Sequence, residues 1–122
     1  MHHFDKHIHH RRVHHKSAPM RGLLHACILC IIREKPAYGS EIHQKLKEKF
    51  NIEPPKPLVY TLLRRMERSG LIVSTWDIQE SGPARRVYKI TEEGIEHLRN
   101  MANRLKKIIP IIESIIKSIE ES

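Results

Sequence analysis

The chain has 122 residues, a formal net charge of +8 and two cysteines, and it is long enough for one small domain. No stretch approaches the ~18–20 apolar residues of a membrane-spanning helix, and the N-terminus lacks the apolar segment of a secretory signal. Two cysteines do not make a disulfide framework in a chain of this size. The sequence therefore predicts a soluble cytoplasmic protein that does not enter a membrane.

The positive charge lies outside the C-terminal quarter of the chain. Residues 20–90 contain 13 basic and 7 acidic side chains, whereas residues 91–122 contain 5 basic and 6 acidic ones. A basic region on one part of a small domain is typical of a protein that binds a polyanion. A generally basic soluble protein is the alternative explanation of the charge.

Residues 1–19 hold seven of the ten histidines and show almost no apolar periodicity, so we expect a flexible arm. We favour a basic tail that adds positive charge near DNA. A metal site is the second interpretation, because histidine is a common ligand of zinc, copper and nickel. An added tag is the third, although other residue types interrupt the run. The candidate metal ligands are His7, His9, His10, His14 and His15.

Residues 20–33 are densely apolar, and their length favours a buried helix that Pro36 and its charged neighbours end. Cys27 and Cys30 are three positions apart, with His25 just before them, so a redox or metal site has to be considered. A structural zinc site needs four ligands, and the sequence has no second cysteine pair. We therefore favour the interpretation that both cysteines pack in the core.

A second helix is predicted over residues 41–50, with Ser40 as its N-cap after a turn at positions 38–40. Ile42, Leu46 and Phe50 recur every four residues, so we expect them to face the first helix. A linker over residues 51–56 leads to the next element.

Residues 57–69 predict a short amphipathic helix, with Pro57 in its first turn and Gly70 at its end. Apolar positions between Val59 and Met66 recur at helical spacing and form one face. A helix with a buried face and a basic outer face fits a groove of DNA. The outer face carries the candidate DNA-contacting residues Tyr60, Thr61, Arg64, Arg65 and Arg68.

Two strands are predicted next, over residues 71–80 and 86–90, with a turn at Gly82 and Pro83 between them. Arg85 and Arg86 lie at the exit of the turn, where their side chains could reach a phosphate or a minor groove. Trp76 is either a stacking platform or a core residue, and we favour the core.

The last helix begins after Thr91, an N-cap followed by two glutamates. Pro110 predicts a kink or a break. An apolar stripe this long is not stable in water. It could fold back on its own domain, but we favour a partner chain, most simply a second copy. The stripe consists of Leu98, Ala102, Leu105, Ile109, Ile112, Ile116 and Ile119.

The predicted order is helix, helix, basic helix, hairpin and long amphipathic helix, which is a winged helix-turn-helix with a dimerisation helix. Three stretches, LLHACILCIIREKPAYGSEI, LVYTLLRRMERSGLIVSTW and SGPARRVYKITEEGIEHL, resemble the PadR family of transcriptional regulators over about residues 20–98. The resemblance implies that Tyr60, Arg64 and Arg65 belong to a DNA-facing recognition helix, and that Arg85 and Arg86 belong to the wing. It also implies dimerisation through the C-terminal helix, with a small-molecule effector pocket near that interface.

The fold class predicted from the sequence is mainly α with a small β-hairpin. It divides into a His-rich arm (1–19), a winged-helix domain (20–90) and a dimerisation helix (91–122). We expect a homodimeric repressor that binds a palindromic site on double-stranded DNA, without a cofactor and without enzymatic activity. Arg64 and Arg65 are expected to read guanine edges, while Lys56, Tyr60, Arg68 and the wing arginines position the DNA backbone.

Two alternatives stay open at this point. The first is a metal-responsive regulator, whose ion binds the His-rich arm or the group of His25, Cys27 and Cys30. The second is a winged-helix module that binds another protein instead of DNA.

Overall fold

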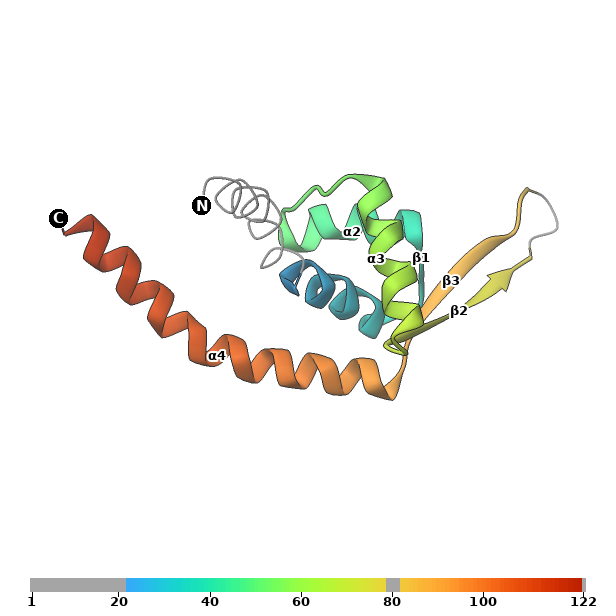
Figure 1. The fold of residues 1–122 in the computed structure, drawn as a ribbon. Coiled ribbons are helices and arrows are strands. Elements are labelled where there is room, and N and C mark those ends of the chain that lie inside the picture. The colour runs from blue at the N-terminus through green and yellow to red at the C-terminus, as the bar shows by residue number, and fades with distance from the viewer. Residues whose placement is uncertain (1–21, 79–81, 122) are drawn as a thin grey trace, which may run out of the picture.

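The computed structural model describes residues 22–78 and 82–121 (Figure 1). A first helix over residues 22–34 leads into a three-stranded antiparallel sheet with strand order β1-β3-β2 and three further helices. This architecture confirms the predicted mainly helical winged-helix fold. The elements are β1 (Ala37–Tyr38), α2 (Gly39–Phe50), α3 (Lys56–Arg68), β2 (Ile72–Asp77), β3 (Arg85–Ile90) and α4 (Glu92–Glu120).

Strand β1 was not predicted, and it changes how α2 begins. Ala37 pairs with Tyr88 and Tyr38 pairs with Val87, so β1 adds a third strand to the hairpin. The predicted turn with Ser40 as N-cap is therefore wrong, because α2 begins at Gly39 with Tyr38 as its N-cap. The Tyr38 N–H donates to the Glu41 carboxylate at 2.9 Å, which satisfies a backbone donor at the helix start. A two-residue strand is too short to leave an alternating pattern in the sequence.

The core is formed mainly by the first helix, α2 and α3, as the apolar spacing predicts, and each strand and α4 add one residue. Ile42 and Leu46 of α2 are fully buried, and Phe50 packs at the edge of the core. Each buried leucine or isoleucine contributes about 1.5–3 kcal/mol relative to an exposed one. Cys27 and Cys30 are half-buried, unbonded to each other and packed against this core, so the core interpretation of both cysteines is confirmed.

Gly70 ends α3 and turns the chain into the hairpin. Its φ is +82°, a conformation that glycine adopts without strain. The Gly70 N–H donates to the Glu67 carbonyl at 3.1 Å, and the Leu71 N–H donates to the Met66 carbonyl at 2.9 Å. These two bonds make a Schellman ending. The Thr91 hydroxyl lies 2.6 Å from the Gly70 carbonyl, so the start of α4 is fastened to the same turn.

The hairpin of β2 and β3 projects from the domain (Figure 1), and its register runs from Ile72–Ile90 to Asp77–Arg85. Strand β2 ends at Asp77, short of the predicted residue 80. Ile72 and Tyr88 near the base are buried, whereas Trp76 is 59% exposed. The favoured core interpretation of Trp76 is therefore wrong, because the outer half of the hairpin lies beyond the reach of the core.

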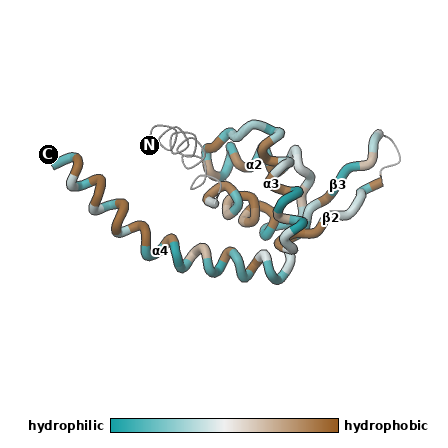
Figure 2. The backbone as a smooth tube through the Cα atoms, in the orientation of Figure 1, coloured by the Kyte–Doolittle hydropathy of each residue, from teal (hydrophilic) through white to brown (hydrophobic). Residues whose placement is uncertain are grey.

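Helix α4 runs unbroken through Pro110, and Figure 1 shows it bending along its length as it leaves the domain. Its predicted N-cap is confirmed, since the Thr91 hydroxyl accepts from the Gly94 N–H at 3.1 Å. Leu98 and Met101 pack on the core, but all residues from 106 to 121 are exposed. The alternative in which the stripe folds back on its own domain is therefore wrong for the residues beyond Leu105, whereas Leu98 at the start of the stripe does pack on the domain. Figure 2 shows that many residues in this exposed half of α4 are hydrophobic.

Among the described residues, no helix is both long enough and apolar enough to cross a membrane. The predicted arm over residues 1–19, with its five candidate metal-ligating histidines, lies outside the described residues.

Candidate nucleic-acid interface

The outer face of α3 presents the basic residues that the sequence singles out. Arg64, Arg65 and Arg68 are exposed on α3, and Tyr60 beside them is 36% exposed. Lys56 is exposed in the first turn of the helix, and Thr61 is half-buried. The opposite face, which carries Val59, Leu62, Leu63 and Met66, is buried. Helix α3 is therefore fixed in the domain, and its basic face is exposed to a partner.

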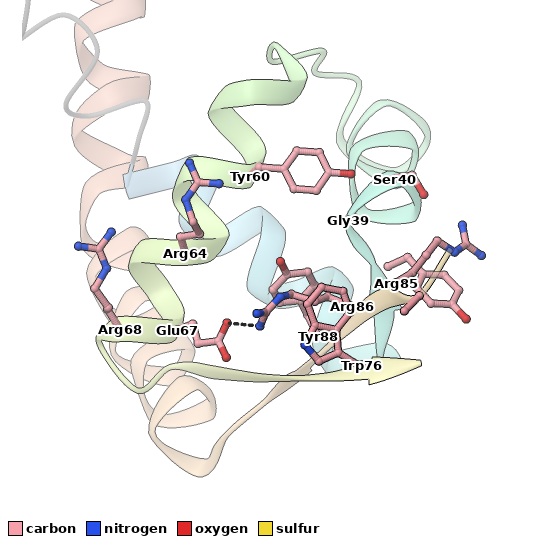
Figure 3. Close-up of a pocket in the computed structure, with 12 residues that line it drawn as sticks. Gly39, Ser40, Tyr60, Arg64, Glu67, Arg68, Trp76, Arg85, Arg86 and Tyr88 are labelled. Carbon is pink, nitrogen blue, oxygen red and sulfur yellow. Dashed lines mark ion pairs between the residues drawn. The ribbon is translucent and has the colours of Figure 1, made fainter. Parts of the chain in front are cut away.

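A concave pocket of about 750 Å³ lies between α3 and the hairpin (Figure 3). Aromatic rings and arginines share its walls, an arrangement that suits an anionic partner with flat or apolar parts. The walls also include one acidic residue, Glu67. The pocket is lined by Tyr38, Gly39, Ser40, Tyr60, Arg64, Glu67, Arg68, Trp76, Ala84, Arg85, Arg86 and Tyr88.

The ring of Tyr60 lies against Gly39, which is part of the first turn of α2 (Figure 3). A Cβ atom added at Gly39 would be 2.9 Å from Cζ of Tyr60, and still closer to Cε1. A real Cβ does not approach a ring this closely, so only glycine leaves room for the observed position of Tyr60. Gly39 thus helps to place a candidate DNA-contacting residue, a role that the sequence pattern did not reveal.

The two arginines of the hairpin have different surroundings. The guanidinium of Arg85 lies over the ring of Tyr38, 3.9 Å from its centroid. The Tyr38 hydroxyl in turn donates to the carboxylate of Asp77, the cross-strand neighbour of Arg85. These contacts connect the outer part of the hairpin to β1 and the start of α2.

Arg86 is held by three other groups. Its guanidinium lies 4.6 Å from the centroid of the Trp76 ring, and its Nη1 donates to the Ser74 hydroxyl at 2.7 Å. The same nitrogen is 4.0 Å from the Glu67 carboxylate, the ion pair drawn in Figure 3. Sequence reasoning missed Glu67, because a glutamate between basic residues on a helix reads as an ordinary solvated side chain.

Two groups in the domain have raised pKa values. Burial raises the pKa of Tyr88 in the pocket wall, against the opposing effect of Arg86, so Tyr88 is neutral at physiological pH. Burial and the neighbouring Cys30 raise the pKa of the Cys27 thiol, which therefore stays protonated at neutral pH. A protonated thiol is a poor nucleophile and a poor metal ligand. In residues 22–78 and 82–121, no three His, Cys, Asp or Glu side chains are arranged to hold a metal ion.

Residues 28–100 match the profile of the Transcriptional regulator PadR-like family. The matched residues run from within the first helix, through the pocket, to the first part of α4. The chain belongs to this family. This confirms the resemblance drawn from the sequence, and membership of a family of transcriptional regulators confirms that the chain is not an enzyme.

Solved structures of PadR-like proteins have the same fold. A PadR-like transcription factor from Bacteroides fragilis is 32% identical, with a TM-score of 0.73 over 82% of this chain and 96% of that chain. A PadR-like transcriptional regulator from Bacillus cereus is 31% identical, with a TM-score of 0.68 over 80% and 94%. PadR of Bacillus subtilis, solved in complex with operator DNA, is 22% identical, with a TM-score of 0.61 over 66% and 46%. At 22% identity, the similarity to the Bacillus subtilis protein establishes only that the two proteins share a fold.

Proposed function

We propose that this PadR-like protein is a sequence-specific DNA-binding repressor that acts as a homodimer on a palindromic site. The observation that carries the proposal is the outer face of α3, where Arg64, Arg65 and Arg68 are exposed beside a pocket walled by the hairpin. A helix fixed by one buried face and basic on the other is the element that winged-helix proteins insert in a major groove. The Bacillus subtilis PadR, which shares the fold, was solved bound to operator DNA.

The exposed stripe of α4 supports the homodimer. Ile109, Ile112 and Ile116 are each about half exposed, at 53%, 48% and 49%, and continue the apolar line that begins at the core. Two copies that pair along this stripe would present two α3 helices related by a two-fold axis. Such a dimer matches two half-sites about 34–36 Å apart, which makes the site palindromic. A dimer seated on a promoter excludes other proteins from the DNA that it covers, and we therefore propose repression.

We assign different roles to the basic side chains. Arg64 and Arg65 on α3 read guanine edges, because arginine donates two parallel bonds to the O6 and N7 acceptors of guanine. Contacts to phosphate fix the register of the protein on the duplex and carry no sequence information. The residues that we assign to the backbone are Lys56, Tyr60, Thr61, Arg68, Arg85 and Arg86.

Any small-molecule effector would bind beside the paired α4 helices. One copy of α4 has a shallow hollow of about 370 Å³ at the flank of the stripe, lined by Ile116 and the charged residues Glu113, Lys117, Glu120 and Glu121. The second copy would supply the opposite wall, so effector binding and dimerisation would be linked.

The test is fluorescence anisotropy with the protein's own promoter DNA and with a scrambled duplex, over a series of salt concentrations. We expect tighter binding to the promoter and an affinity that falls steeply as salt rises, because phosphate contacts release counterions. Binding that ignores both sequence and salt would contradict the proposal and favour a protein-interaction module.

The same titration tests the division of roles. Arg64→Ala or Arg65→Ala should reduce the preference for promoter over scrambled DNA by about tenfold, the discrimination of one bidentate base contact. Arg85→Ala should weaken binding to both duplexes by the same factor. Equal losses on both duplexes for all three variants would contradict the assignment.

A further inference from the structure

Glu67 connects α3 to the hairpin through a small network of polar contacts. Its carboxylate accepts from the Ser74 backbone N–H at 3.1 Å and from the Ser74 hydroxyl at 2.8 Å. The Ser74 hydroxyl also accepts from Arg86 Nη1 at 2.7 Å, and that guanidinium lies over the Trp76 ring. One side chain of α3 thereby holds both strands of the hairpin.

The strand that Glu67 holds is an edge strand. In the order β1-β3-β2, one side of β2 has no neighbouring strand within residues 22–78 and 82–121. The Ser74 N–H donates to Glu67, so this backbone donor is satisfied from α3 instead of from the sheet. Hydrogen bonds to a charged acceptor are about twice as strong as neutral ones. By contrast, the ion pair between Glu67 and Arg86 spans 4.0 Å with side chains 34% and 44% exposed, and such pairs contribute little. The Ser74 bonds therefore dominate the connection.

The position of Glu67 is unfavourable for simple electrostatics. Among the described residues that line the pocket, it alone is acidic, while Arg64, Arg68, Arg85 and Arg86 are basic. A carboxylate beside a phosphate backbone repels it. A negative charge in this place is therefore best explained by the contacts that it makes within the protein.

We infer that Glu67 is a positioning residue, which sets the spacing between α3 and the hairpin so that both can contact one DNA duplex. The inference rests on the proposed DNA-binding function. A two-stranded hairpin is marginally stable by itself, and here only its base is buried, at Ile72 and Tyr88. Fixing the hairpin before binding reduces the entropy that DNA binding has to overcome.

Two substitutions at Glu67 separate positioning from charge. Glu67→Gln keeps the length of the side chain and removes the negative charge, whereas Glu67→Asp keeps the charge and shortens the reach. If charge alone matters, Glu67→Gln should tighten DNA binding and Glu67→Asp should leave it unchanged. If Glu67 positions the hairpin, both variants should weaken promoter binding, by about three- to tenfold.

A second readout needs no DNA. Trp76 is the single tryptophan of the chain, and it lies under the guanidinium of Arg86. When Glu67 no longer holds Ser74, Arg86 and Trp76 should move more independently. We expect faster acrylamide quenching and a lower fluorescence anisotropy of Trp76 in the free variants. Circular dichroism checks that the variants remain folded.

The matched control is Glu96→Gln on α4. Glu96 also pairs with an arginine, Arg99, at 3.4 Å, and it lies outside the pocket. Glu96→Gln changes the net charge as Glu67→Gln does, but it should leave both the Trp76 signal and the affinity for promoter DNA unchanged.

Each outcome decides the inference. Weaker binding together with a changed Trp76 signal in both Glu67 variants supports it. Unchanged or tighter binding overturns the positioning role, whatever the Trp76 signal. An unchanged Trp76 signal overturns the connection itself. If the unsubstituted protein shows no salt-sensitive DNA binding, the proposed function fails, and the Trp76 signal still decides whether Glu67 holds the hairpin.

Discussion

The winged-helix domain and the outer half of α4 carry the same kind of apolar stripe, yet only one of them is covered. Ile42 of α2 is fully buried between the helices of the domain, whereas Ile116 of α4 is 49% exposed. Both residues have apolar neighbours at helical spacing: Leu46 lies four positions after Ile42, and Ile112 and Ile119 lie four before and three after Ile116. The periodicity is thus the same in the two regions, while their burial differs completely.

This difference shows what an apolar pattern in a sequence determines. A stripe of isoleucines and leucines will be removed from water, because each exposed side chain costs about 1.5–3 kcal/mol relative to a buried one. The pattern does not say which chain will cover the stripe. In the domain the cover is local, and on α4 we propose that a second copy provides it.

The largest expected effect comes from placing charge on the uncovered stripe. Ile112→Asp combined with Ile116→Asp should weaken self-association by about a hundredfold or more, because each carboxylate would be desolvated in the interface without a partner. Size-exclusion chromatography with light scattering measures the mass. Asn103→Asp, on the polar side of α4, is the control and should keep the mass of the unsubstituted protein. A double variant with that same mass would show that this stripe does not form the interface.

The two regions can next be compared through one chemical change. Ile42→Ala should lower the free energy of unfolding by about 2–5 kcal/mol, through lost burial and the cavity left behind. Ile116→Ala should cost less than about 0.5 kcal/mol at high dilution, where the protein is monomeric. At high protein concentration its cost should increase, because the dimer is then the folded state that loses contacts. Urea unfolding at two protein concentrations distinguishes these cases. If Ile42→Ala and Ile116→Ala lowered the free energy of unfolding by similar amounts at every protein concentration, the two regions would not differ as described.

A smaller effect tests whether close packing also determines the shape of the surface that we propose contacts DNA. Gly39→Ala places a methyl group against the Tyr60 ring, so Tyr60 has to move. We expect promoter affinity to fall by about three- to tenfold, with a stability loss of about 1–2 kcal/mol. Gly22→Ala is the control, since among the described residues no atom outside its own helix turn lies within 4 Å of the added methyl group. Anisotropy titration measures the promoter affinity of both variants. Unchanged binding for Gly39→Ala would show that the position of Tyr60 is unimportant for DNA binding.

The smallest expected effect is a loss of stability at alkaline pH, which is caused by two groups of the winged-helix domain. Burial raises the pKa of Cys27 above its usual 9.0 and that of Tyr88 above its usual 10.0. The folded state therefore binds these protons more tightly than the unfolded state does. The contribution of these two groups to the free energy of unfolding should be constant up to about pH 9 and should then decrease as they ionise in the unfolded state. Urea midpoints across this range measure the decrease, and Cys27→Ala should make it shallower. An increase in stability with pH would contradict the assigned direction.

Sequence periodicity was sufficient to predict the elements whose burial is continuous along the chain. The buried face of α3, the Gly70 ending and the Thr91 cap follow from local rules, and so did the winged-helix order. Strand β1 could not be predicted because two residues carry no pattern. The exposure of Trp76 depends on how far the hairpin projects, which is a tertiary property.

The candidate site was predictable by residue type but not by contact. Exposed arginines on an amphipathic helix are visible in the sequence. The role of Gly39 depends on the nearby Tyr60 ring, and that of Glu67 depends on Ser74 seven positions away. Such pairs carry no periodic signal, so only the folded structure brings them together.

The most direct test of the account is the mass of the unsubstituted protein in solution and on promoter DNA, measured by sedimentation velocity. If the α4 stripe is covered by a second copy, the protein should sediment as a dimer at micromolar concentration and should bind one duplex as two chains. A monomer in solution that binds DNA as a single chain would contradict the account, because the exposed isoleucines of α4 would then have no partner.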